Sequence, residues 1–444
     1  MKNLLIFFLL FLAACSIIGG FFYFSITKEI RVGDLGEFKE ENLVPDFSKK
    51  QKVGNITVVE LEGTPYEIGY QNGALMKGEI RELLNEAYAQ YLPRGSSKSH
   101  LIRVFLLWMI KRVDPHIPLE YRQEMQGVAD GAGMGYNDIL LLNAFEEGLN
   151  TLHPLVLLKL FDLAGLSHGC SSVIVHKGSK SDHLIVGQTV DFSITVGAGR
   201  SVLYVIKSPH KKTLYTPSFP GFVLLVNGMN EDGLVLTQRA TPTGWGRVGT
   251  PISAIARKLL EESESLDSAR DYLAKSQWFV PRSLLIADFK SNVSSIFEIL
   301  PGEGVEEIAN EKGYSGAANH FKTQEFYEVQ VEALNKYGNQ EYISRYNGSL
   351  RREEYLADYI EAEMSANPEK IAEAISDYNY DRREELQGAE RHYNLHSSWI
   401  GGTVSNEETS QAIVFVPEEK IIYLADGLAA PVTQGGFVKI DLNF

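Results

Sequence analysis

Cysteine is scarce in this sequence, because its 444 residues contain only Cys15 and Cys170. Two cysteines cannot build a disulfide framework, and they exclude a cysteine-rich zinc or iron–sulfur site. A long basic run is also absent, since 57 acidic residues against 42 basic ones leave a net charge of −15. Such a chain binds nucleic acid and anionic lipid surfaces poorly, so we expect no nucleic-acid partner. Each cysteine therefore needs an explanation of its own.

The rest of the composition is ordinary for a globular protein, with 44% apolar and 22% charged residues. This composition excludes global disorder, collagen and a coiled coil. At ~150 residues per domain the length suggests about three domains, although a large layered sheet can use more chain in one domain.

One uncharged and almost wholly apolar stretch covers residues 4–26. As a helix rising about 1.5 Å per residue, it is long enough to span a bilayer uncleaved. Alternatively, residues 12–15 (Leu-Ala-Ala-Cys) resemble a bacterial lipobox, in which Cys15 would be lipidated and become the new N-terminus. Both interpretations attach the protein to a membrane, on the extracytoplasmic side. We expect a signal or anchor over residues 1–26 and a polar stalk over residues 27–55.

The pattern of apolar residues divides the body of the chain into two regions. Residues 56–169 begin with one strand and then show the three- and four-residue spacing of helices. From residue 170 to 444, short β-rich runs separated by turn residues alternate with pairs of helices. This pattern predicts an α+β fold of two packed sheets covered by helices. The expected strands of the second region include 172–175, 184–190, 202–206, 222–226, 234–237, 283–288, 295–300, 412–416 and 421–425.

Cys170 lies where the helical pattern gives way to the β pattern. A lone cysteine is by default a buried structural residue. Here Gly169 precedes the thiol and leaves the preceding carbonyl unhindered, while Ser171 and Ser172 are small and polar. The surroundings of Cys170 therefore favour a nucleophile over a core residue.

These residues resemble the start of the catalytic subunit in N-terminal nucleophile (Ntn) cysteine hydrolases. The nearest resemblance is to the acyl-CoA:6-aminopenicillanic acid acyltransferase type, with choloylglycine hydrolase and acid ceramidase more distant. It implies an αββα four-layer sandwich with a helical N-terminal propeptide region, and no cofactor or metal. The similar segments are 63–73, 135–143, 169–172, 187–192, 219–221, 227–234, 318–321 and 344–345.

The resemblance implies a precursor that cuts itself between Gly169 and Cys170. An unperturbed cysteine has a pKa of ~8.5, and the α-amino group released by the cut has a pKa of ~7.7 to 8.0. That amine can accept the thiol proton, so no histidine is needed. We expect two associated chains and a Cys170 acyl-enzyme that forms from an amide or thioester donor.

Asp191 and Gln188 bear on the same centre. Asp191 ends the next predicted strand, where adjacent strands would return it to the nucleophile. By resemblance it holds the α-amino group through a charge-assisted hydrogen bond. Several relatives carry an arginine where this chain has Gln188, which favours the acyltransferase branch over bile-salt hydrolases and ceramidases.

Two asparagines and an arginine complete the predicted site. Asn319 and Asn230 are candidates for stabilising an oxyanion through their side-chain NH₂ groups. Asn230 also precedes a turn, and turn formation is the alternative explanation for it. Arg345 resembles the active-site arginine of the family, with Arg351 and Arg352 close enough to compete for that assignment.

Two other functions fit the same sequence. The chain could stay uncut and bind an acyl ligand or a partner as a surface lipoprotein, or it could be a papain-like hydrolase with a histidine base. Processing at Cys170 and the activity of histidine variants distinguish them. Apolar residues in the expected pocket loops suggest an acyl or aromatic group in the substrate.

Overall fold

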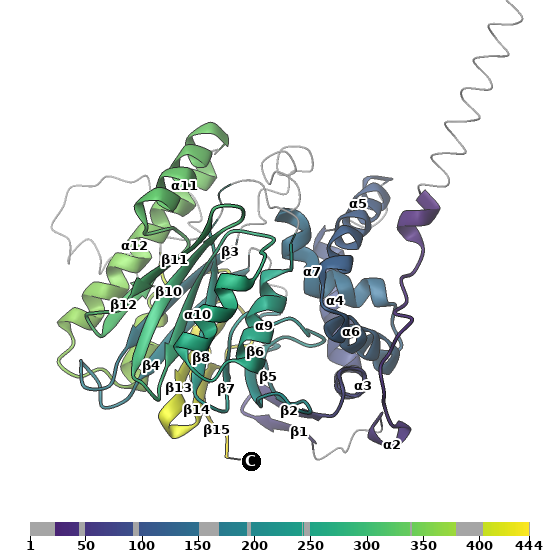
Figure 1. The fold of residues 1–444 in the computed structure, drawn as a ribbon, viewed down its shortest axis with the longest axis horizontal. Coiled ribbons are helices and arrows are strands. Elements are labelled where there is room, and N and C mark those ends of the chain that lie inside the picture. The colour runs from purple at the N-terminus through teal and green to yellow at the C-terminus, as the bar shows by residue number, and fades with distance from the viewer. Residues whose placement is uncertain are drawn as a thin grey trace, which may run out of the picture.

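The computed structural model describes residues 23–43, 49–91, 97–150, 168–192, 197–241, 243, 249–337, 340–378 and 403–443. Two β-sheets form its centre (Figure 1). The nine-stranded sheet contains β1 (Lys50–Val53), β2 (Ile56–Glu62), β5 (Val202–Lys207), β6 (Leu214–Ser218), β7 (Gly228–Asn230), β8 (Leu234–Ala240), β9 (Arg282–Asp288), β10 (Val293–Leu300) and β11 (Gly304–Ala309), in that order. The six-stranded sheet contains β12 (Tyr314–Ala317), β3 (His168–Val175), β4 (Ile185–Phe192), β13 (Thr409–Val416), β14 (Ile421–Ala425) and β15 (Phe437–Asp441), in that order.

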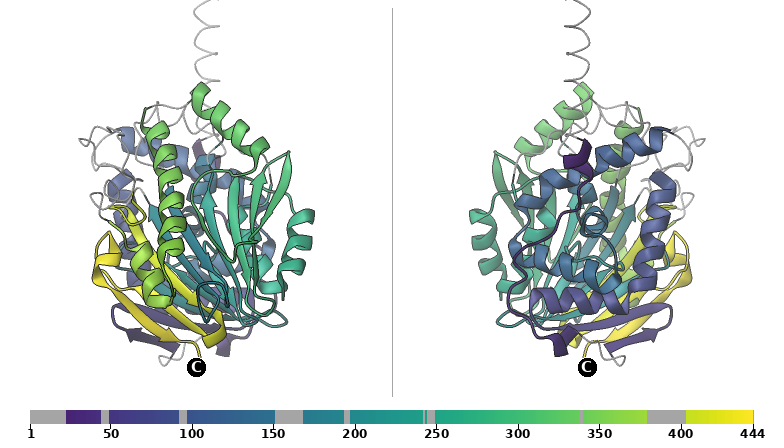
Figure 2. Two further views of the ribbon diagram at one scale, coloured as in Figure 1. Left: turned by 90° about the vertical axis from the view of Figure 1, so that its left-hand side faces the viewer. Right: turned by 90° about the vertical axis from the view of Figure 1, so that its right-hand side faces the viewer.

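Helices cover the outer faces of both sheets (Figures 1 and 2). The predicted helical region is confirmed as far as residue 150, while the helix expected near residues 154–163 lies outside the described residues. The helices are α2 (Glu40–Leu43), α3 (Pro65–Leu75), α4 (Lys77–Tyr91), α5 (Ser97–Val113), α6 (Leu119–Ala132), α7 (Tyr136–Asn150), α9 (Ile252–Glu262), α10 (Leu266–Lys275), α11 (Gln324–Tyr337), α12 (Gln340–Ala362) and α13 (Pro368–Ile375).

Strand alternation produces the four layers. On β2, Val59 packs with the core of α3 to α10, whereas Val58 packs against the six-stranded sheet. On β3, Ile174 packs between the two sheets, whereas Val173 and Val175 pack against α12 and α13. Successive side chains of a strand point to opposite faces, so both sheets are buried on both sides. The predicted αββα sandwich is confirmed.

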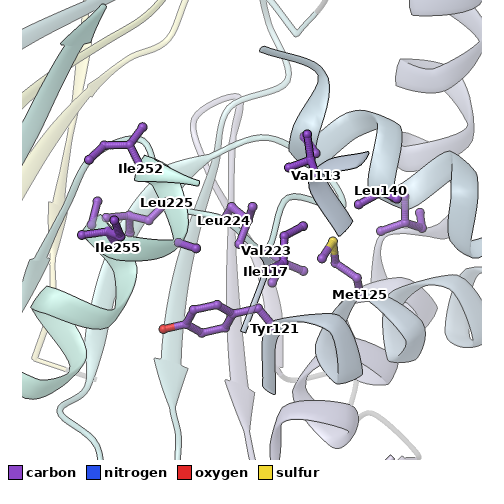
Figure 3. Close-up of a cluster of buried hydrophobic side chains, with 14 of the residues drawn as sticks. Val113, Ile117, Tyr121, Met125, Leu140, Val223, Leu224, Leu225, Ile252 and Ile255 are labelled. Carbon is purple, nitrogen blue, oxygen red and sulfur yellow. The ribbon is translucent and has the colours of Figure 1, made fainter. Parts of the chain in front are cut away.

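The N-terminal helices share a continuous core with the rest of the molecule. Figure 3 shows Tyr121 and Met125 of α6 in one apolar cluster with Val223 and Leu224, and with Ile255 of α9. In addition, β1 and β2 belong to the nine-stranded sheet, where β2 pairs in parallel with β5. The regions on either side of the expected cut therefore form one structural unit.

The described part of residues 27–55 is not a stalk. Val32 is 8% exposed and joins the helical core, and its N–H donates to Gln126 Oε1 at 3.2 Å. Glu29 accepts a hydrogen bond from the backbone N–H of Asn137. Strand β1 extends the sheet. The predicted stalk is wrong here, because a few spaced apolar residues, too sparse to show a period, pack against the core that other segments form.

Candidate active site

The pairing of β3 with β4 places Cys170 beside Asp191. The two strands are antiparallel, with Gly169 opposite Asp191 and Cys170 opposite Val190. Cys170 is 5% exposed. Its side chain shares the face of Ile174, between the sheets, because residues an even number of positions apart on a strand share a face. The prediction that Asp191 lies next to the Cys170 strand is therefore confirmed, while its role stays a prediction.

Asp191 explains why residue 169 is glycine. A Cβ atom at Gly169 would lie 2.7 Å from Asp191 Oδ2, so any side chain there would force the carboxylate to move. The carboxylate accepts hydrogen bonds from Thr409 Oγ1 at 2.7 Å and from Asn406 Nδ2 at 2.9 Å. Burial raises the pKa of Asp191 above its usual value, although the Arg352 guanidinium and the two hydrogen bonds oppose this rise. Asp191 therefore lies against Gly169, the residue whose bond to the Cys170 nitrogen would be cut.

Asn319 holds the other side of that nitrogen. Its Oδ1 accepts the backbone N–H of Cys170 at 2.8 Å and Arg352 Nη2 at 2.6 Å. Its Nδ2 donates to the Ala240 carbonyl at 2.8 Å, and the second hydrogen of this NH₂ group remains for another acceptor. The backbone N–H of Asn319 donates to Ser349 Oγ at 2.6 Å. Asn319 thus contacts the backbone nitrogen of the proposed nucleophile, and its role as an oxyanion donor stays a prediction.

The arginine nearest this centre is Arg352, not Arg345. Arg352 is 2% exposed, and besides Asn319 it contacts Ser171 Oγ through Nε at 3.0 Å. Arg345 lies two turns earlier on α12 and forms an ion pair with Glu408 at 3.3 Å. The charge of Arg345 lowers the pKa of Asp191, but the charge of Arg352 lowers it more. The assignment to Arg345 is corrected to Arg352, because the phase of α12 decides which side chain reaches β3.

Asn230 lies outside the site. Its Nδ2 donates to the carbonyls of Leu260 and Ser263, and its Oδ1 accepts the N–H groups of Asp232 and Leu234. These bonds close the turn between β7 and β8. Leu234 lies at one end of β8 and Ala240, whose carbonyl accepts from Asn319, lies at the other, about 20 Å away at ~3.3 Å per residue. The turn explanation is therefore correct, and the prediction of an oxyanion donor has no support from the position.

A polar cluster between the sheets was not predicted from the sequence. Arg239, at the end of β8, donates to Ser172 Oγ at 2.6 Å and to Ser283 Oγ at 2.9 Å. Thr237 and Gln188 also contact Ser172. The alternation of side chains along β8 could have predicted this cluster. Val235, Thr237 and Arg239 share the face that points between the sheets, and a charged residue on that face needs polar partners.

The described ranges contain no group of three or more His, Cys, Asp or Glu side chains arranged to hold a metal ion. None of the helices described between residues 23 and 443 combines the length and apolar character needed to cross a bilayer. Cys15 and residues 1–22 of the expected anchor lie outside the described residues.

Comparison with known proteins identifies the family. The family model for acyl-coenzyme A:6-aminopenicillanic acid acyl-transferase matches residues 177–404, more than half of the chain. The chain belongs to this family. The matched region contains Asp191, Asn319 and Arg352, and it begins after Cys170. The family is named after an acyltransferase, and the proteins similar to this chain include an N-acylethanolamine-hydrolyzing acid amidase from Caenorhabditis elegans.

Individual relatives are distant. The 40 kDa form of acyl-coenzyme A:6-aminopenicillanic-acid-acyltransferase from Emericella nidulans is 25% identical over 264 residues, covering 59% of this chain and 68% of that protein. An uncharacterized protein from Archaeoglobus fulgidus is 26% identical over 253 residues, covering 52% of this chain and 41% of that protein. The chain thus spans less than half of the Archaeoglobus relative.

A solved structure, a mutant conjugated bile acid hydrolase from Clostridium perfringens, is 12% identical with a TM-score of 0.36, covering 61% of this chain and 92% of that one. We draw nothing from so low a similarity.

Proposed function

We propose that the chain is an Ntn cysteine amidohydrolase or acyltransferase that activates itself by cutting the Gly169–Cys170 bond. One observation carries this proposal: the Cys170 N–H donates to Asn319 Oδ1 at 2.8 Å, while Asp191 lies opposite the adjacent Gly169 with its carboxylate against that residue. If cleavage turns the Cys170 nitrogen into a charged terminus, Asp191 and Asn319 can stabilise it, because both would accept hydrogen bonds from an ammonium group.

The cut proceeds in two steps. Cys170 Sγ attacks the Gly169 carbonyl carbon, the C–N bond breaks, and the released amine takes up the thiol proton. Water then hydrolyses the thioester, which breaks the C–S bond, frees the Cys170 thiol and gives the Gly169 carboxylic acid. The acid loses its proton to the Cys170 amine, which becomes an ammonium group. Arg352 holds Asn319 in place during both steps.

The mature reaction uses the same atoms. The α-amine accepts the Cys170 thiol proton, and the thiolate attacks the carbonyl of an amide or thioester donor. The second hydrogen of Asn319 Nδ2 donates to the developing oxyanion. The amine or thiol leaving group departs with the proton, and water or an acceptor amine resolves the acyl-enzyme.

Intact-mass analysis and N-terminal sequencing of the purified protein test the cut. We expect a chain that begins at Cys170 and a Cys170→Ala control that stays whole. A parent protein that remains a single chain without activity would favour the acyl-binding alternative. A histidine→Ala variant that is cut normally but inactive would favour a histidine base instead.

A panel of N-acyl p-nitroanilides and acyl thioesters, with and without an added amine, separates the two reaction types. Free acid as the only product indicates a hydrolase. Transfer of the acyl group to the amine in competition with water indicates an acyltransferase.

We also propose that the N-terminal apolar run attaches the enzyme to the extracytoplasmic side of a membrane. The support is the uncharged stretch of residues 4–26 and the lipobox-like residues 12–15. Metabolic labelling with a radioactive fatty acid should be lost in a Cys15→Ala variant if Cys15 is lipidated. Detergent-phase partition that persists without any label in the parent would indicate an uncleaved anchor.

A further inference from the structure

Arg239 and Cys170 lie on facing surfaces of the two sheets. Ser172 follows Cys170 by two residues on β3, so both side chains point between the sheets. Arg239 reaches this face from β8 of the other sheet, and its Nη1 donates to Ser172 Oγ at 2.6 Å. The guanidinium therefore lies against the surface that carries the thiol.

The charge of Arg239 has no carboxylate to balance it. The side chain is fully buried, and its hydrogen bonds go to the neutral hydroxyls of Ser172, Thr237 and Ser283. Its Nε–H has no hydrogen-bond partner, and the described residues place no carboxylate oxygen within ion-pair distance of it. A buried charge left in this state is costly unless an anion compensates it.

The two acidic residues whose charges reach Arg239 are bound elsewhere. Glu298 accepts the N–H groups of Lys322 and Thr323 at 2.6 and 2.9 Å. Glu353 forms an ion pair with Lys322 at 2.7 Å, and its other carboxylate oxygen lies 2.9 Å from His320 Nε2. Within the described part of the site, the remaining group that can become an anion next to Arg239 is the Cys170 sulfur.

We propose that Arg239 is the counterion of Cys170 and holds its sulfur as the thiolate. Burial lowers the pKa of Arg239 to about 10, and the negative charge of Cys170 is the foremost influence that raises it. The guanidinium is therefore still protonated at neutral pH. By linkage the same interaction lowers the pKa of the Cys170 thiol, and an opposite charge within ~4–6 Å typically does so by about 1–3 units.

This role answers a difficulty in the proposed function, on which it rests. Before the cut the Cys170 nitrogen is an amide that donates to Asn319 and cannot accept the thiol proton. A thiolate stabilised by Arg239 is available at that stage, so the first N-to-S attack needs no amine. After the cut, Arg239 and the α-amine act on the same sulfur.

The test titrates the thiol directly. In a Cys15→Ala background Cys170 is the only cysteine, so the pH dependence of iodoacetamide alkylation and of ultraviolet thiolate absorbance reports this residue alone. Arg239→Gln should raise the midpoint by about 1–3 units, and Arg239→Lys should keep it near the parent value. Arg282→Gln is the matched control. Arg282 is also buried and lies at the same end of the sheet, but its side chain is on the face that packs against the helices and not on the face toward Cys170.

Two results would overturn the proposal. One is a folded Arg239→Gln protein whose midpoint equals that of the parent. The other needs no variant: a parent midpoint at or above the unperturbed ~8.5. A parent with a low, Arg239-dependent midpoint but no cut and no acyl-transfer activity would reject the proposed function and leave the role of Arg239 intact. A parent that is cut and active, but whose midpoint does not change in Arg239→Gln, would reject the role of Arg239 and leave the proposed function intact.

Discussion

At the scale of single residues, the site depends on what each side chain excludes as well as on what it binds. Glycine at position 169 leaves room for Asp191 Oδ2, which a side chain there would displace. Asn319 is held by three different elements, through Cys170 on β3, Ala240 on β8 and Arg352 on α12. A small displacement at any of these contacts moves the atoms that react.

Gly169→Ala should slow self-cleavage by about 10–100-fold, because misplacing a reacting group by ~1 Å costs rate on this scale. The time course of precursor loss on a gel measures it. Gly78→Ala is the control, since a Cβ there meets nothing within 4 Å. Residue 169 belongs to the other chain after the cut, so activity per processed molecule should remain close to the parent value. Cleavage at the parent rate would contradict the steric argument.

Arg352→Gln should lower kcat/KM of processed enzyme by about 100-fold or more, as loss of oxyanion stabilisation does. The reason is that Asn319 loses the charged donor that orients its amide. Arg345→Gln removes the same charge from the same helix but leaves Asn319 held, so a smaller effect is expected. A larger loss in the Arg345 variant would restore the assignment made from the sequence.

At the scale of elements, α12 supports the site through a chain of polar contacts. Glu353 Oε2 lies 2.9 Å from His320 Nε2, and His320 Nδ1 contacts Ser349 Oγ at 2.8 Å. Ser349 in turn accepts the backbone N–H of Asn319. This series of contacts ends at Asn319, in the loop after β12. Helix α12 therefore positions Asn319 through Ser349 at its backbone and through Arg352 at its side chain.

Acid should weaken this support. Burial would raise the pKa of Glu353, but the hydrogen bond and charge of His320, followed by Lys322, outweigh it and lower the pKa to about 2 from 4.5. A carboxylate with a depressed folded-state pKa stabilises the fold above its unfolded value, and this contribution disappears as the pH falls from 4.5 to 2. The shift corresponds to about 3 kcal/mol.

Urea unfolding of the parent and of Glu353→Gln across this pH range measures that contribution. The difference between the two proteins should be largest near pH 7 and vanish near pH 2. Glu361→Gln, an exposed position on α12, is the control and should match the parent throughout. A constant difference at all pH values would mean that the carboxylate charge is not the source.

At the scale of the whole molecule, the two regions on either side of the cut are joined by buried charges as well as by a shared core. Arg257 of α9 forms ion pairs with Glu124 of α6 at 2.7 Å and with Glu261 at 2.9 Å. Tyr121 of α6 donates to Glu261 at 2.8 Å. These side chains are almost fully buried, so removing one member takes away part of the compensation of a buried charge.

Glu124→Gln should weaken the association of the two processed chains by about 3–5 kcal/mol, the usual cost of breaking a buried ion pair. Size-exclusion chromatography in rising urea measures the dissociation. Glu120→Gln alters the partly exposed edge of the same network and should cost under about 1 kcal/mol. Equal effects of the two variants would show that the apolar core alone holds the chains together.

A strand predicted from local sequence fails to form where a side chain takes the hydrogen bonds that a neighbouring strand would otherwise make. Residues 222–226 are apolar and were expected as a strand. Instead, the N–H groups of Val223 and Leu224 donate to Asn143 Oδ1 of α7 at 2.6 and 3.0 Å. By contrast, the expected strands 412–416 and 421–425 pair as predicted. The difference is that a hairpin depends on neighbours in sequence, whereas Asn143 is 80 residues away from Val223.

The sequence by itself determined the layered α+β fold, the position of Cys170 at the start of a strand, and the return of Asp191 on the next strand. These features follow from strand period and chain order, which are local. Tertiary structure alone decided that Arg352 replaces Arg345, that Asn230 closes a turn and that Arg239 faces the thiol. Each of these depends on helix phase and on the packing of two sheets between segments far apart in the chain, and no short stretch of sequence contains that information.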